Sequence, residues 1–277
     1  MNYRHAFHAG NFADCLKHAA LVAVLLHLRK KDTPFAVIDT HGGRGLYDIA
    51  GVEAKKTGEA QDGIERLLAV ESVPGVLEPY RALVRGFGPN LYPGSPLIAA
   101  KLLRAKDRLV GIEKHPEEHA QLAAALAGDS RCRAVLGDYR EALPRLLAPP
   151  ERRGLVLIDP PYEAPDEFAD ATRALIAAHR RFATGIFLLW YPAKERPLID
   201  ASAGELLNAG IASLMKMELD VGHSDGAAPS RLSATGLLVV NPPFGFAAEM
   251  ERILPFLAVT LSQGAGAAGT LKSFAER

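Results

Sequence analysis

The stretch Leu155-Val156-Leu157-Ile158-Asp159-Pro160-Pro161-Tyr162 constrains the fold more than any other part of the chain. Its apolar first half predicts a buried parallel strand. Two consecutive prolines have no backbone N–H groups and a fixed φ, so the strand must end before them and the chain leaves the sheet extended. We therefore expect Asp159 and Tyr162 at the carboxyl edge of the sheet, where open α/β folds place their ligands.

The same stretch suits chemistry on the amino group of a nucleobase. That nitrogen is a poor nucleophile, because its lone pair is delocalised into the ring. The Asp159 carboxylate and the Pro160 carbonyl oxygen can accept both amino hydrogens and free the lone pair, while Tyr162 offers a flat face to an extruded base. The alternative interpretation is a strand that ends in a Pro-Pro turn with a solvated Asp159, because short motifs also occur without function.

Acidic residues end four predicted parallel strands. The strands cover residues 35–40, 108–112, 133–136 and 155–158, and the acids are Asp39, Glu113, Asp138 and Asp159. The first strand runs into a glycine-rich turn, residues 41–45, whose Gly-Gly-x-Gly spacing differs from the Gly-x-Gly-x-x-Gly of dinucleotide enzymes. Acids along one sheet edge can accept hydrogen bonds from ribose hydroxyls and an adenine amino group. The pattern therefore indicates a nucleoside-containing cofactor.

The rest of the chain predicts helices between the strands and a closing hairpin. Asn11 is a candidate N-cap for a helix to about residue 31, and Ser95 is a candidate N-cap before Pro96. Residues 46–92 carry charges, Gly, Pro and short helical patterns, and predict a small helical insertion within a single domain of residues 1–277. Runs at 213–221 and 235–240 form the hairpin.

These elements predict an α/β fold with a Rossmann-like, seven-stranded sheet of the kind found in S-adenosylmethionine-dependent methyltransferases. The expected strand order is 3-2-1-4-5-7-6, with the last strand antiparallel to the others. Such a sheet places the four acidic strand ends along one edge.

Charge and cysteine content limit the partners. Lys+Arg and Asp+Glu both number 32, so any nucleic-acid contact must be a local patch and not a generally basic surface. Cys15 and Cys132 form no Cys-x-x-Cys pair, and the longest apolar stretch, residues 19–28, is too short to cross a bilayer. We expect a cytoplasmic monomer without a membrane segment or a metal.

Two further motifs compete with this interpretation. Asn241-Pro242-Pro243-Phe244 repeats the acid-or-amide, Pro, Pro, aromatic pattern, but it follows the antiparallel strand and is expected at the opposite edge. His115-Pro116-Glu117-Glu118-His119 matches the His-x-x-Glu-His spacing of a zinc site. Pro116 begins a helix there, so the two imidazoles need not share a face, and no third ligand is evident.

Several stretches of the chain form a combined pattern: Tyr3-Arg4-His5-Ala6-Phe7-His8-Ala9-Gly10-Asn11, Asp14, Leu16-Lys17-His18, Asp39-Thr40-His41, Pro93-Gly94-Ser95-Pro96 and Asp159-Pro160-Pro161-Tyr162-Glu163. In these residues the chain resembles the ribosomal RNA large subunit methyltransferase J family, the 23S rRNA adenine(2030)-N(6)-methyltransferases, over essentially its whole length. The opening stretch, residues 3–11, is far more specific than Asp-Pro-Pro-Tyr, which many amino-methylating enzymes share. The resemblance implies a Rossmann-like methyltransferase domain with a small helical insertion, S-adenosylmethionine as cofactor and 23S ribosomal RNA as substrate.

The resemblance also implies roles for individual residues, with direct methyl transfer to a flipped adenine. Two alternatives stay open: amino methylation of adenine or cytosine in DNA, and a cofactor-binding, RNA-associated module without turnover. The implied cofactor contacts are Lys17, His18, His41 and Ser95 at the methionine end, Glu113 at the ribose and Asp138 at the adenine, with Tyr139 and Asp159 as further contacts. The implied catalytic residues are Asp159, Pro160 and Tyr162, and the implied RNA contacts are Tyr3 and Arg4.

Overall fold

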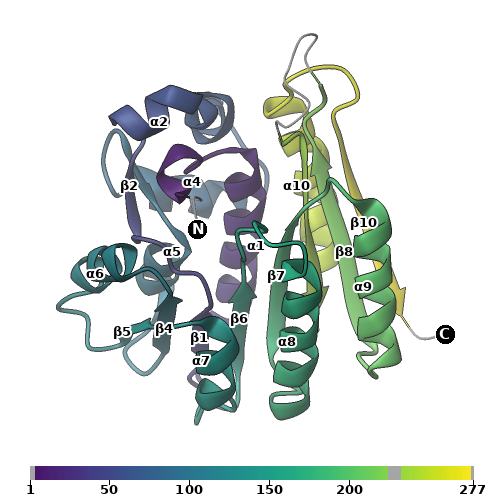
Figure 1. Ribbon diagram of the computed structural model, residues 1–277. Coiled ribbons are helices and arrows are strands. Elements are labelled where there is room, and N and C mark those ends of the chain that lie inside the picture. The colour runs from purple at the N-terminus through teal and green to yellow at the C-terminus, as the bar shows by residue number, and fades with distance from the viewer. Residues whose placement is uncertain (1–3, 224–231, 276–277) are drawn as a thin grey trace.

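A mostly parallel sheet of eight strands runs through the molecule, in the order β10-β8-β9-β7-β6-β1-β4-β5 (Figure 1). The computed structural model describes residues 4–223 and 232–275. Five neighbouring strands, β5, β4, β1, β6 and β7, pair in parallel, and β9 runs antiparallel to both of its neighbours, β7 and β8. The strands are β1 (Ala36–Asp39), β4 (Arg108–Glu113), β5 (Cys132–Leu136), β6 (Gly154–Ile158), β7 (Ile186–Pro192), β8 (Ser213–Asp220), β9 (Ala234–Val240) and β10 (Ala268–Ala275).

The expected order of the first seven strands is confirmed, but the expected number of strands is wrong. The eighth strand, β10, pairs antiparallel with β8 over its whole length. Most of its side chains are exposed or half-buried, so backbone pairing holds this strand at the sheet edge without a strong apolar pattern. The sequence of residues 264–269 is rich in Gly and Ala and does not indicate a strand. Gly269 has a structural role, because the absence of a side chain lets β10 approach Leu254 closely.

Helices cover both faces of the sheet. One face packs against α1 (Phe12–Arg29), α4 (Leu77–Arg85), α5 (Ser95–Leu102), α6 (Pro116–Ala125) and α10 (Phe246–Thr260), and the other against α7 (Tyr139–Leu146), α8 (Glu167–Arg181) and α9 (Arg196–Asn208). Side chains of β6 alternate between the two cores: Leu155 and Leu157 face the first layer, and Val156 and Ile158 face the second. Burial on both sides explains the continuous apolar run of this strand.

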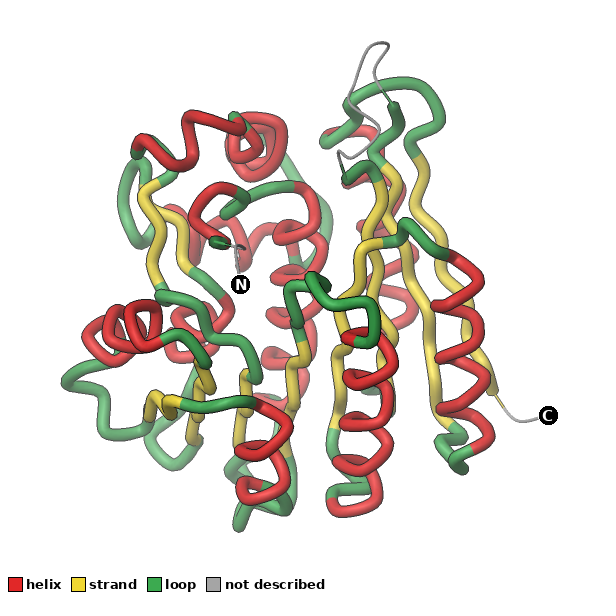
Figure 2. Tube along the Cα trace, in the orientation of Figure 1, coloured by secondary structure: helices red, strands yellow, loops and turns green. Residues whose placement is uncertain are grey.

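Residues 46–92 combine short helices with a second, two-stranded sheet. They form β2 (Leu46–Asp48), α2 (Val52–Thr57), η2 (Gln61–Glu65), α3 (Arg66–Ala69), α4 and β3 (Leu91–Pro93), and β2 pairs antiparallel with β3. Ile64, Leu67 and Tyr80 are fully buried in the same core as Leu16 of α1. Figure 2 shows α2 and η2 beyond the carboxyl edge of the main sheet, near the start of α1.

The start of α1 follows the sequence prediction, whereas the start of α5 does not. Asn11 caps α1, because its side chain accepts a hydrogen bond from the backbone N–H of Asp14 at 2.9 Å. Ser95 is the first residue of α5 and not its cap, which is Gly94. The buried Ser95 side chain instead lies close enough to the Asp39 carboxylate to lower the pKa of that acid, against the effect of burial. In the described part of the chain, no helix has both the length and the apolar character needed to cross a membrane.

Candidate functional site

Two cavities open at the carboxyl edge of the sheet, and the Asp159 side chain lines both. The first, of about 320 Å³, lies between the turn after β1, the start of α5 and the ends of β4 and β5. The second, of about 710 Å³, lies between the N-terminal segment, the chain after β6 and the end of β7. Both volumes fall within the range of about 300–1,000 Å³ typical of small-molecule sites. Asp159 therefore stands where two ligands can meet.

Glu113 joins two loops at the rim of the first cavity. One of its carboxylate oxygens accepts a hydrogen bond from the backbone N–H of Gly43 at 2.9 Å, and the other accepts one from the backbone N–H of His115 at 2.8 Å. These bonds fix the carboxylate at the end of β4, next to the turn after β1. Each oxygen has a second lone pair, so Glu113 can still accept hydrogen bonds from a bound hydroxyl.

Asp138 and Tyr139 form the far wall of the first cavity. Asp138 caps α7 and forms ion pairs with Lys114 at 3.0 Å and with Arg140 at 2.7 Å. The hydrogen bond from Arg140 is the main reason that the pKa of Asp138 lies well below its usual range, so this carboxylate is ionised. The Tyr139 ring packs against the His41 ring at 4.7 Å between centroids. The two rings are tilted by 53° to each other and provide an aromatic surface beside the acid.

Two of the imidazoles that line the first cavity, those of His41 and His18, are neutral. Burial lowers the pKa of His41 to about 4 and that of His18 to about 3. His41 shares a hydrogen bond of 2.7 Å with Thr40 Oγ1, and His18 Nδ1 shares one of 2.6 Å with the Tyr92 hydroxyl. The side chains of His18 and its neighbour Lys17 are both buried, although both residues are polar.

Three buried polar atoms near this cavity have no partner among the described residues. They are Nε2 of His18, Oδ2 of Asp39 and the hydroxyl oxygen of Tyr139. Burial raises the pKa of Asp39 to about 6, although the Ser95 hydroxyl opposes this shift. Buried polar atoms are nearly always hydrogen-bonded, so an unpaired donor or acceptor beside a cavity marks a place for a polar ligand.

Asp159 is held by a buried lysine. Lys17 Nζ lies 2.5 Å from Asp159 Oδ2 and 2.9 Å from Asp14 Oδ1, and the lysine side chain is only 5% exposed. Although burial opposes the charge, the two carboxylates raise the pKa of Lys17, so it is a cation. Lys17 was expected near the methionine end of a cofactor; its Nζ lies on the Asp159 carboxylate, and its side chain lines both cavities.

The chain after Asp159 turns sharply into the second cavity. Pro160 is buried, and Tyr162 has a φ of 55°, a left-handed conformation that is unusual for a residue other than glycine. The Tyr162 hydroxyl donates a hydrogen bond to the Trp190 carbonyl at 2.5 Å. Its ring packs against Phe168 and Trp190, each at 5.6 Å between centroids. The turn therefore places three aromatic rings along one wall of the cavity.

Of the two predicted RNA contacts, Tyr3 and Arg4, the structure describes Arg4. Arg4 lines the first cavity and is 3.9 Å from Glu53, with its own side chain 60% exposed. Tyr3 lies outside the described residues. Sequence reasoning missed Glu59, Phe168 and Trp190, which line the second cavity. No local motif marks these three residues, because they come from separate elements that only the fold brings together.

The two competing motifs lie elsewhere. The Asn241 side chain donates hydrogen bonds of 2.8 Å to the carbonyls of Ala183 and Gly185, just before β7 begins, so it lies at the amino edge of the parallel strands. This contact gives Asn241 a structural role in the loop. Among the described residues, no group of three or more His, Cys, Asp or Glu side chains is placed to hold a metal ion. His115 and His119 therefore belong to no such group.

Known proteins resemble this chain over most of its length. A family model described as ribosomal RNA large subunit methyltransferase D, RlmJ, matches residues 32–271. Ribosomal RNA large subunit methyltransferase J of Escherichia coli K12 is 39% identical over 262 residues, which cover 93% of this chain and 92% of the relative. Its counterpart in Haemophilus influenzae Rd is 37% identical over 266 residues, with 94% of each chain covered. A crystal structure of a Legionella pneumophila protein aligns with a TM-score of 0.87 and 30% identity, covering 97% of this chain and 99% of that one.

Proposed function

Because the chain belongs to the ribosomal RNA large subunit methyltransferase J family, and is thus a methyltransferase of large-subunit ribosomal RNA, we propose that it transfers a methyl group from S-adenosylmethionine to N6 of adenine 2030 in 23S rRNA. The position and the base rest on the family resemblance. The observation that supports the chemistry is the placement of Asp159, whose carboxylate lines both cavities.

The first cavity fits the cofactor. S-adenosylmethionine supplies, when bound, a methyl group made electrophilic by a sulfonium. The Glu113 carboxylate would accept hydrogen bonds from the ribose, and Asp138 with Tyr139 would border the adenine. The unpaired atoms of His18 and Asp39 suit the amino-acid end, because that end carries both hydrogen-bond donors and acceptors.

The second cavity fits a purine base that has left its stack. Tyr162 lies on its wall between Phe168 and Trp190, so the three rings form an apolar surface on which a flipped base can lie. The volume of about 710 Å³ also leaves room for part of the RNA backbone. The entrance between the N-terminal segment and residues 161–165 is where that backbone would pass.

Asp159 and Pro160 would activate the amino nitrogen. Lys17 occupies Asp159 Oδ2, whereas Oδ1 has no partner among residues 4–223 and 232–275 and is available to accept an amino hydrogen. The Pro160 carbonyl would accept the second hydrogen. With both hydrogens held, the nitrogen lone pair would turn out of the ring plane and toward the first cavity, where the methyl donor would bind. Lys17 fixes the orientation of the carboxylate.

A methyl-transfer assay with labelled S-adenosylmethionine tests this proposal on three substrates: unmodified 23S rRNA, double-stranded DNA and assembled large subunits. We expect label in the rRNA, recovered as N6-methyladenosine after digestion. Label in DNA alone would favour the amino methylation of DNA. Cofactor binding without label in any substrate would favour a module without turnover.

A further inference from the structure

The N-terminal segment, residues 4–11, forms one wall of the second cavity, opposite Asp159 and Tyr162. Its side chains His5, His8 and Asn11 line that cavity. Its regular structure is a single turn of 3-10 helix, η1 (His5–Phe7), so little of its conformation is stabilised from within. Chain ends without tertiary contacts are usually disordered, and this wall therefore depends on contacts from another element.

Residues 57–64 of the insertion provide those contacts. The backbone N–H of Ile64 donates a hydrogen bond to the Gly10 carbonyl at 2.7 Å, and the Thr57 hydroxyl donates one to the Phe7 carbonyl. A Cβ atom on Gly63 would lie 2.1 Å from the Gly10 carbonyl oxygen. The two backbones therefore cross at a distance that only glycine permits at position 63.

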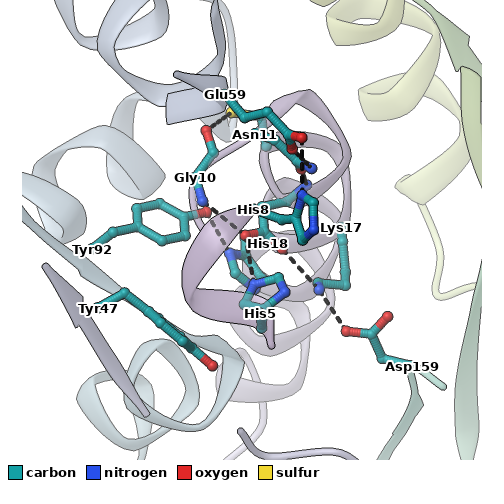
Figure 3. A network of polar contacts seen from close by, with 12 residues as sticks. His5, His8, Gly10, Asn11, Lys17, His18, Tyr47, Glu59, Tyr92 and Asp159 are labelled. Carbon is teal, nitrogen blue, oxygen red and sulfur yellow. Dashed lines mark hydrogen bonds and ion pairs between the residues drawn. The ribbon is translucent and has the colours of Figure 1, made fainter. Parts of the chain in front are cut away.

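Glu59 ties two side chains of this wall to the insertion. One of its carboxylate oxygens is 2.9 Å from His8 Nδ1, and the other accepts a hydrogen bond from Asn11 Nδ2 at 2.9 Å (Figure 3). The hydrogen bond with Glu59 is also the main reason that the pKa of His8 is raised. Hydrogen bonds that involve a charged group are about twice as strong as those between neutral groups.

The same contacts continue to the catalytic carboxylate. Asn11 Oδ1 accepts the backbone N–H of Asp14, and the Asp14 carboxylate pairs with Lys17, which holds Asp159. Figure 3 shows Glu59 near one end of this network and Asp159 at the other. The network thus spans the second cavity from the insertion to the point of methyl transfer.

We propose that the insertion at residues 46–92 acts as a clamp that sets the RNA-facing wall of the active site, with Glu59 as the positioning residue for His8 and Asn11. The inference rests on the proposed function, since it assigns the wall to the RNA substrate. Glu59 itself takes no part in methyl transfer. Because Glu59, His8 and Asn11 line the second cavity and not the first, removal of Glu59 should affect the use of RNA much more than the binding of the cofactor.

The test compares Glu59→Ala with Glu65→Ala in the full-length protein. Glu65 belongs to the same insertion, but its side chain is exposed and does not line the second cavity, so it is a matched control. We expect Glu59→Ala to lower kcat/KM for 23S rRNA by about 10-fold or more, because two hydrogen bonds of a charged group are lost. The dissociation constant for S-adenosylmethionine should change by less than about 2-fold, and Glu65→Ala should match the wild type.

Thr57→Val is a second variant that keeps the shape of the side chain. It removes only the hydroxyl that donates to the Phe7 carbonyl, at an exposed position, so the protein should fold normally. We expect a several-fold fall in kcat/KM for RNA with cofactor affinity retained. Wild-type kcat/KM in folded Glu59→Ala or Thr57→Val, or an equal loss of cofactor affinity, would overturn the clamp. If the wild-type protein itself does not methylate rRNA, the proposed function is contradicted, and this outcome is distinct from one that overturns the clamp.

Discussion

Replacing Lys17 by methionine probes the ion pairs that hold the active site together. The lysine side chain is 5% exposed, and its two partners Asp14 and Asp159 are 2% and 15% exposed. Methionine has a similar length and fills the same space, so the change removes the charge and few packing contacts. Asp14 then retains His5 Nε2 and the backbone N–H of Gly10 as partners, both at 2.9 Å.

The expected cost is large because one cation serves two carboxylates. Removing one partner of a buried ion pair typically costs about 3–5 kcal/mol, since the remaining charge stays buried without compensation. The fully buried Asp14 accounts for most of this cost, whereas Asp159 is partly hydrated. Lys17→Met should thus lower the free energy of unfolding by about 3–5 kcal/mol at neutral pH.

Urea unfolding of four proteins checks this reasoning: the wild type, Lys17→Met, the control Lys106→Met, and Lys17→Met combined with Asp14→Asn. Lys106 is exposed, so its replacement should change stability by less than about 0.5 kcal/mol. The double variant should cost less than the sum of its two single changes, because the asparagine needs no cation. A cost for Lys17→Met below about 1 kcal/mol, or strict additivity, would refute the view that this lysine neutralises a buried carboxylate.

Three further predictions concern the site. Asp159→Asn should abolish methyl transfer in a labelled-methyl assay, while the affinity for the cofactor stays within about 3-fold. Asn241→Ala should methylate at the wild-type rate. An equal loss of methyl transfer in both folded variants would contradict the assignment of residues 159–162 as the catalytic motif. Glu113→Ala should weaken S-adenosylmethionine binding by about 1.5–3 kcal/mol in isothermal titration, and an unchanged affinity would show that this strand end does not hold the ribose. His18 has a pKa of about 3 in the folded protein against an ordinary value of 6.5. Between these two pH values the unfolded chain binds a proton at His18 and the folded chain does not, so the free energy of unfolding falls as the pH drops from 6.5 toward 3. His18→Gln should decline less steeply over that window in urea unfolding, and an identical decline would mean that His18 is not buried in its neutral form.

The order of the first seven strands was predictable because it depends on local rules. A continuous apolar run needs burial on both faces, and two prolines end a strand wherever they occur, so residues 155–162 are enough to place Asp159 at a sheet edge. The cap of α1 by Asn11 follows from one side chain and the next three residues. The eighth strand was not predictable in this way, since the backbone pairing that holds β10 leaves few buried side chains to form a pattern.

Only the tertiary structure decided which side chains meet at the site. Lys17 and Asp159 are 142 positions apart, and Asn11 and Glu59 are 48 positions apart, yet each pair is in hydrogen-bond contact. The sequence alone determined that acids stand at strand ends and that the N-terminal segment is rich in polar side chains. It could not determine their partners, because an ion pair or a hydrogen bond imposes no spacing on residues from separate elements. The packing of α1 and the insertion against the sheet selected those partners and completed the two cavities.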